Sequence, residues 1–200
     1  MSYIALIDHF AAHQNLPLHV EQVLGWIRTN TDHTKIDLYP VGRNSQAFRG
    51  LCRRRAVPTS LVAYGDGDFE IETQILFGKD LSEDWRRLVI TKEALHVFDP
   101  EPERINAPEA FKRLVPEVIA PELKGAPFVP AMNDHLGAFR AMAVLVPREA
   151  RKKLQVAVES NTRSIEDVAR YVRLPTFYVD IWLRWGDQLD AALCRMYPAV

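Results

Sequence analysis

The sequence predicts an α+β domain, because helix-like and strand-like periodicities fall into separate blocks of the chain. Apolar residues recur at helical spacing before residue 30 and after residue 82, whereas the stretch 35–77 alternates with a period near two. Helices placed before and after a run of strands are typical of α+β domains. The 200 residues, 48% hydrophobic and 26% charged, are expected to form a single globular domain over residues 1–200.

Two N-terminal packing helices are expected within residues 1–30. Ser2 is a suitable N-cap for the first helix, which is expected to end near Asn15. The second is expected from about Leu18 to Thr29, because apolar side chains recur there on one helical face.

A small, mostly antiparallel sheet is expected over residues 35–77. Short strands are predicted around Ile36 and Leu51, and residues 61–77 are predicted to form two strands joined at Gly65–Asp68. In the second of these strands, apolar or small side chains alternate with polar ones, namely Phe69, Ile71, Thr73 and Ile75 with Glu70, Glu72 and Gln74. This alternation predicts one buried and one solvated face.

The main candidate motif lies on a predicted helix over residues 82–99, with Ser82 as its cap. In the zinc-peptidase motif H-E-x-x-H, two histidines on one helical face hold zinc while the glutamate activates the bound water. Here the pattern is Lys92, Glu93 and His96. The lysine ammonium has three donors and no lone pair, so at pH 7 it cannot ligate a metal in the first histidine's place.

Proline-rich residues 100–130 are predicted to form a loop with one helix over about 108–119, and the remainder of the chain is predicted to be helical. An apolar helix is expected over residues 132–147. Residues 148–200 are expected to hold three more helices, with a capping box formed by Ser164 and Asp167 at the start of one of them.

These motifs, in this order, resemble the ImmA/IrrE family of zincin-like metallopeptidase domains over roughly residues 60–185. The family helix R-R-F-T-L-A-H-E-L-G-H matches RRLVITKEALH at residues 86–96 without a gap, so the motif here is a degenerate HExxH. The family's second site helix, which begins with an acidic ligand, matches residues 134–147. Residues 164–184 are similar to the family's trailing helical pair. The resemblance implies a zincin-like fold with the motif on a core helix.

The same resemblance implies that Glu93 would be the general base if the protein were an active enzyme, and that His96 and Asp134 would be ligands if a divalent metal, zinc in the family, were bound. Lys92 replaces the remaining ligand and leaves two where catalytic zinc sites have three. His135 or Asp99 could restore the third. Asp99 follows His96 by three residues on the same predicted helix, so His96, Asp99 and Asp134 could form an oxygen-rich site for another divalent ion.

Each of these residues also has an ordinary structural interpretation. Glu93 and His96 could be a solvated and a partly buried residue of an amphipathic helix, and Asp134 could be an N-cap. Lys92 could face solvent, or it could pair with Glu93 or Asp134 and balance the charge of a buried acid. The sequence leaves the presence of any metal open.

The leading functional hypothesis is a noncatalytic protein with a degenerate metallopeptidase fold that binds a peptide or protein segment. The resemblance implies a regulatory role in bacteria or phage. One alternative is an active metal-dependent peptidase with a rearranged metal site. Another is a DNA-binding regulator that uses the C-terminal helices, where Arg170, Arg173 and Arg184 could meet phosphates.

Composition disfavours partners that are recruited by a broad charged surface. The formal net charge is -1 and the pI about 6.6, with acids and bases interleaved, which argues against nucleic acid as a partner. No apolar run reaches the roughly 20 residues of a membrane span. Two isolated cysteines, Cys52 and Cys194, predict reduced thiols and a cytoplasmic location. Trp182 and Trp185 favour core packing or a subunit contact, so a homo-oligomer is conceivable.

Overall fold

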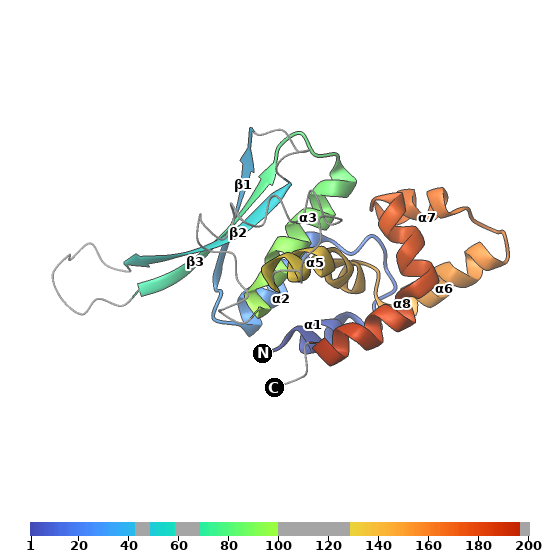
Figure 1. The fold of residues 1–200 in the computed structure, drawn as a ribbon, viewed down its shortest axis with the longest axis horizontal. Coiled ribbons are helices and arrows are strands. Elements are labelled where there is room, and N and C mark those ends of the chain that lie inside the picture. The colour runs from blue at the N-terminus through green and yellow to red at the C-terminus, as the bar shows by residue number, and fades with distance from the viewer. Residues whose placement is uncertain (43–48, 59–68, 100–128, 197–200) are drawn as a thin grey trace.

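A computed structural model describes residues 1–42, 49–58, 69–99 and 129–196, which form helices packed on a small sheet (Figure 1). The α+β class predicted from the sequence is confirmed. The helices are α1 (Tyr3–Phe10), α2 (Val20–Asn30), α3 (Glu83–Leu95), α5 (Val129–Leu145), α6 (Arg148–Glu159), α7 (Ile165–Val172) and α8 (Thr176–Met196), with a 3-10 turn η1 (His96–Phe98). The strands are β1 (Lys35–Val41), β2 (Gly50–Pro58) and β3 (Phe69–Gly78).

The sheet has the order β1-β3-β2 and is mixed, so the expectation of a mostly antiparallel sheet was wrong. β2 pairs with β3 in antiparallel fashion, with Gly50 opposite Phe77 and Pro58 opposite Phe69. β1 instead lies on the other side of β3 and runs parallel to it. The chain passes from β1 at one edge of the sheet to β2 at the other edge, and β3 then lies between them. β3 is therefore antiparallel to β2 but parallel to β1. The predicted turn Gly65–Asp68 and the predicted strand before it lie outside the described residues, as does the helix predicted at 108–119.

The expectation of a solvated face on β3 was wrong for Glu72 and Gln74, which are both buried. As the central strand, β3 has neighbours on both sides, and their long side chains cover it. The Arg53 side chain donates a hydrogen bond to Gln74 Oε1 at 2.5 Å, and Lys35 Nζ lies 4.0 Å from Glu72 Oε1. The alternation of polar and apolar residues therefore predicted that Glu72 and Gln74 share one face of β3, but it did not predict that these two side chains are buried.

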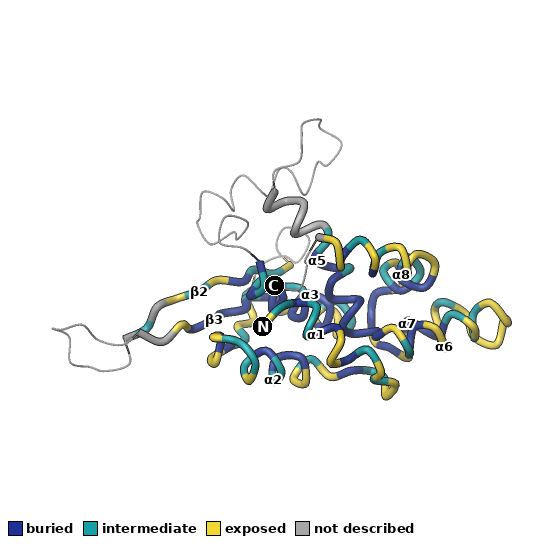
Figure 2. The backbone as a smooth tube through the Cα atoms, turned by 90° about the horizontal axis from the view of Figure 1, so that it is seen from below, coloured by how far each residue is buried: buried dark blue, intermediate teal, exposed yellow. Residues whose placement is uncertain are grey.

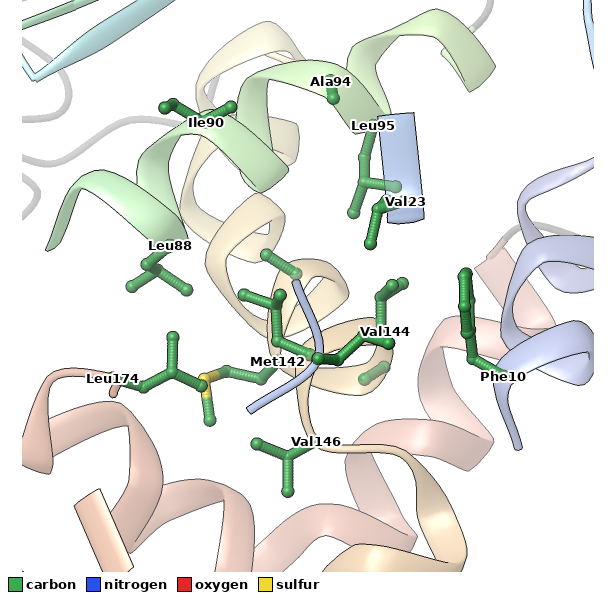
Figure 3. Close-up of a cluster of buried hydrophobic side chains, with 14 of the residues drawn as sticks. Phe10, Val23, Leu88, Ile90, Ala94, Leu95, Met142, Val144, Val146 and Leu174 are labelled. Atoms are coloured by element: carbon green, nitrogen blue, oxygen red, sulfur yellow. The ribbon is translucent and has the colours of Figure 1, made fainter. Parts of the chain in front are cut away.

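The hydrophobic core includes the contact between α3 and α5, and Figure 2 shows most of α3 and most of residues 136–145 of α5 as buried. Leu88 and Leu95 of α3 and Met142 and Val144 of α5 are all buried in one cluster (Figure 3). Ser82 caps α3 as predicted, because its Oγ accepts a hydrogen bond from the Trp85 amide at 3.4 Å. The motif residues are thus carried by a core helix.

Helix ends follow local hydrogen bonds where the sequence signals a cap. Ser2 caps α1, and Ser164 and Asp167 form the predicted capping box of α7. The helix α1 ends at Phe10, earlier than the predicted end near Asn15. Beyond it the His13 amide bonds to Phe10 O and the His13 ring bonds to Asn15 O, each at 2.8 Å, and these local turns replace further helical bonds.

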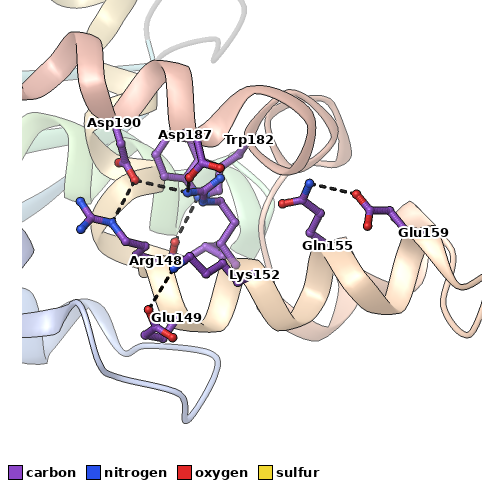
Figure 4. A network of polar contacts seen from close by, with 10 residues as sticks. Arg148, Glu149, Lys152, Gln155, Glu159, Trp182, Asp187 and Asp190 are labelled. Atoms are coloured by element: carbon purple, nitrogen blue, oxygen red, sulfur yellow. Dashed lines mark hydrogen bonds and ion pairs between the residues drawn. The ribbon is translucent and has the colours of Figure 1, made fainter.

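Polar contacts join α6 to α8, where Arg148 of α6 lies near Asp190 of α8 (Figure 4). The buried Arg151 of α6 contributes to the same network. Arg151 donates a hydrogen bond to Asp187 Oδ1 at 2.6 Å and a longer one to Asp190 Oδ2 at 3.4 Å. Burial raises the pKa of Asp190, although Arg151 and Arg148 oppose that shift. Trp182 beside this network is buried and donates to Val146 O at 3.1 Å, so it serves the core as predicted.

Gly186 allows this arginine to lie against α8, and its replacement should therefore be costly. A Cβ at Gly186 would lie 2.6 Å from Cδ of Arg151, whose side chain is held by Asp187 and Asp190. We expect Gly186→Ala to lower the free energy of unfolding by about 1–3 kcal/mol, which is typical of overpacking. Gly25→Ala in α2 is the matched control, because its Cβ would meet nothing within 4 Å. It should stabilise by about 0.5–1 kcal/mol through helix propensity. Urea denaturation measures both, and equal effects would rule out the steric explanation.

Candidate functional site

The motif residues gather where α3 ends. Lys92 and Glu93 lie in the last turn of α3, and His96 is the first residue of η1. The α-helix ends at Leu95 rather than continuing through the predicted 82–99 range, and the chain tightens into the 3-10 turn. This tighter turn brings the carboxylate of Asp99 beneath the imidazole, where His96 Nδ1 lies 2.5 Å from Asp99 Oδ2.

Lys92 and Glu93 form an ion pair at the edge of the core. Lys92 Nζ lies 2.9 Å from Glu93 Oε1, and the side chains are only 13% and 3% exposed. Glu93 Oε1 is buried and accepts no hydrogen bond within the described residues, so the contact is electrostatic rather than a directed hydrogen bond. The ammonium therefore compensates a carboxylate that water cannot reach.

Two glycines let neighbouring elements close over this ion pair. A Cβ at Gly137 of α5 would lie 2.9 Å from Cγ of Lys92, so the lysine stem packs directly on the α5 backbone. A Cβ at Gly50 would lie 2.8 Å from Oε1 of Glu93, so β2 begins directly over the glutamate. Gly137 was part of the resemblance to the second family helix, whereas the packing role of Gly50 was not predicted.

A buried arginine of α5 anchors the other end of the cluster. Arg140 NH1 lies 2.5 Å from Asp99 Oδ1, and NH2 donates to Leu95 O at 2.9 Å. The exposed fractions of Arg140 and Asp99 are 1% and 0%. Burial alone would raise the pKa of Asp99, but the hydrogen bond from His96 and the charge of Arg140 outweigh it and hold that pKa below its usual value.

Arg140 was not predicted as a site residue. The available signal was a single arginine inside the apolar run GAFRAMAVL of the second site helix. A charged residue in such a run needs a buried partner, because an isolated buried charge is costly. Tyr3 of α1 supports the arginine from the opposite side: its ring centroid lies 4.8 Å from the guanidinium carbon, and its hydroxyl donates to Arg140 O at 3.1 Å.

The imidazole of His96 is oriented by Asp99. When Nδ1 donates its proton to the carboxylate, a neutral imidazole keeps its lone pair on Nε2. That atom lies 3.6 Å from Oε2 of Glu93. A histidine fixed by a carboxylate in this way is suited to accept a proton or to ligate a metal, and here it faces the carboxylate of an ion pair.

The described side chains do not fit a zinc site with three protein ligands. Lys92 brings an ammonium to the first ligand's place, and both carboxylate oxygens of Asp99 already contact His96 and Arg140. In the part of the chain that the structure describes, no group of three His, Cys, Asp or Glu side chains is placed to hold a metal ion. Asp134 and His135 lie on α5, but their side chains are outside the described residues.

The arginines considered for DNA contact each lie in an ion pair. Arg170 lies 3.0 Å from Asp167, Arg173 lies 2.9 Å from Glu83, and Arg184 lies 2.7 Å from Asp180. Three acidic partners offset the three positive charges of this surface. The α7–α8 pair therefore lacks the concentrated positive charge that favours phosphate binding.

Comparison with known proteins finds no matching family model, no matching curated protein and no matching solved structure. Within the described residues, no helix is both long and apolar enough to cross a membrane.

Proposed function

We propose that this protein is a noncatalytic member of the zincin-like class, in which the Lys92 ammonium takes the place of the metal ion. It binds a peptide or protein segment in a regulatory role. The observation that carries the proposal is the ion pair between Lys92 Nζ and Glu93 Oε1 at 2.9 Å, with Glu93 only 3% exposed.

The charges of the cluster support this proposal. Lys92 and Arg140 carry two positive charges, and Glu93 and Asp99 carry two negative charges, so the four side chains balance without a metal ion. A glutamate that acts as a general base must be free to take a proton from water. Here Glu93 is ion-paired and lies beneath Gly50, which favours a structural role over turnover.

Peptide binding is supported by the position of β2. Within the described residues β2 pairs only with β3, so one edge of β2 has no strand beside it. Extended peptides bind such edges through main-chain hydrogen bonds. Because β2 begins over Glu93 at Gly50, a segment added along β2 would approach the Lys92–Glu93 pair.

The proposal is tested by the metal content of protein purified without chelator or nickel. We expect the unmodified chain to contain no stoichiometric zinc, even after addition of excess zinc. Lys92→His should bind about one equivalent, because it restores a ligand with a lone pair one helical turn before His96, and the proposed zincin-like fold supplies Asp134 as the acidic ligand. Lys92→Arg is the matched control, since it keeps a cation and supplies no ligand.

Two results would overturn the proposal. About one equivalent of a divalent ion in the unmodified chain, lost in Asp134→Ala, would instead favour the metal-dependent peptidase. A folded Lys92→His variant that binds no zinc would contradict the inferred zincin-like geometry, since the replaced ligand would then not be the missing component.

A further inference from the structure

One side of α8 carries apolar side chains that the fold leaves at the surface. Phe177 and Trp185 are 66% and 57% exposed, and Ile181 between them is half-buried. Their spacing of four residues places them in one row along the helix, called the outer row here. The opposite side of α8 carries Trp182 and Leu183, which are buried where the helix packs against its neighbours. The outer row is therefore apolar surface in excess of what the core uses.

An aromatic cluster holds the first residue of the outer row in place. The ring centroid of Phe177 lies 5.3 Å from that of Tyr178, in an edge-on arrangement. The ring centroid of Tyr178 in turn lies 5.8 Å from that of Phe139 of α5 and 5.7 Å from that of Trp85 of α3. A ring that is already held loses less conformational entropy when a partner buries it. Aromatic side chains of this kind are typical anchors of protein interfaces.

A pair of opposite charges borders the outer row on one flank. Arg184 Nε lies 2.7 Å from Asp180 Oδ1, one helical turn away. With 3.6 residues per turn, both residues lie on the same side of Ile181. When two α8 helices pack antiparallel about a two-fold axis at Ile181, their charged flanks come together, and Asp180 of each copy lies beside Arg184 of the other. A parallel pair would place the two flanks on opposite sides. The charges therefore match a second copy in the antiparallel arrangement.

The area of the outer row indicates a weak association. An aromatic side chain has about 150–250 Å² to bury, so the exposed parts of Phe177 and Trp185 in two copies would contribute about 350–650 Å². A specific interface buries at least about 1,000 Å² in total, and Ile181 with the charged flank must supply the remainder. Such an interface lies at the lower limit for a specific complex, so we expect a dimer that dissociates on dilution.

We propose that the outer row is a self-association surface, on which two copies of this chain pair their α8 helices antiparallel. The aromatic side chains of the two copies bury one another's exposed surface around the two-fold axis. Asp180 and Arg184 fix the orientation, because each meets its opposite charge across the interface. The proposal is independent of the function proposed above.

The test is sedimentation velocity of the full chain over a concentration range of about 1–500 μM, which covers weak protein association. We expect the sedimentation coefficient to rise from that of a monomer towards that of a dimer within this range. Phe177→Ser and Trp185→Ser should each raise the dimer dissociation constant about tenfold or more, because aromatic anchors carry most of the binding energy. Val156→Ser is the matched control: Val156 is 63% exposed on α6, outside the outer row, and its replacement should leave the dissociation constant unchanged.

Two charge variants test the antiparallel orientation. Asp180→Arg gives each copy two positive charges on the flank, and Arg184→Asp gives each copy two negative charges. Each variant alone should therefore associate about tenfold more weakly than the unmodified chain. Mixed in equal amounts, the two variants should form a mixed dimer at least as readily as the unmodified chain, because opposite charges then meet. Both side chains are partly exposed, and circular dichroism checks that each variant is folded.

Three results would overturn the proposal. An unmodified chain that stays monomeric over the whole concentration range has no self-association surface. A dimer that neither Phe177→Ser nor Trp185→Ser weakens uses another surface. Mixed charge variants that associate no better than each variant alone would exclude the antiparallel arrangement.

Discussion

Lys92→Met is expected to lower the free energy of unfolding by about 3–5 kcal/mol, because it leaves Glu93 as a buried charge without its cation. Methionine keeps most of the aliphatic stem that packs on Gly137, so the loss should come from charge rather than from a cavity. The Glu93 side chain is only 3% exposed, which prevents solvent from replacing the ammonium. Urea denaturation at neutral pH, followed by circular dichroism, measures the change.

Two further variants separate the buried ion pair from a general effect of losing a lysine. Lys92→Met combined with Glu93→Gln removes both charges and should recover most of the lost stability, as with buried pairs replaced together. Lys152→Met removes an exposed lysine that lies 3.4 Å from Glu149, and it should change stability by no more than about 1 kcal/mol. If Lys92→Met were as mild as Lys152→Met, Lys92 could not be the counter-charge that Glu93 requires.

The helices were predicted better than the sheet, for a physical reason. Helical periodicity and capping are local, so Ser82, Ser164 and Asp167 identified two helix starts from the sequence. Strand pairing depends on residues far apart in the chain. Nothing within residues 35–41 showed that β1 would run parallel to β3, and the burial of Glu72 depends on its position in the central strand.

The candidate site shows the same division between local and distant information. Lys92, Glu93 and His96 were found because a helical spacing joins them. The burial of Lys92 depends on Gly137, and the orientation of Asp99 depends on Arg140, which are both on a helix distant in sequence. Asp99 was considered as a metal ligand because it follows His96 by three residues. The contact of its second oxygen with Arg140 could not be read from that spacing.

Asp99→Asn is expected to lower the free energy of unfolding by about 3–5 kcal/mol at neutral pH, because it removes a buried negative charge that pairs with the buried Arg140. The substitution keeps the size of the side chain, so the effect reports charge. The pKa of Asp99 is lowered in the folded protein because His96 and Arg140 outweigh the opposing effect of burial. The carboxylate therefore stabilises the fold above its unfolded pKa of about 3.9, and this stability is lost as the pH falls through the folded pKa.

The pH dependence of stability shows whether Asp99 stabilises the fold through its charge or through packing. The stability difference between the unmodified chain and Asp99→Asn should be constant near neutral pH and should shrink below about pH 4, where the unfolded chain takes up a proton. Asp180→Asn is the control: Asp180 pairs with the exposed Arg184, and its loss should cost no more than about 1 kcal/mol. A stability difference that persisted unchanged through acidic pH would show that the effect of Asp99→Asn does not come from the charge of Asp99.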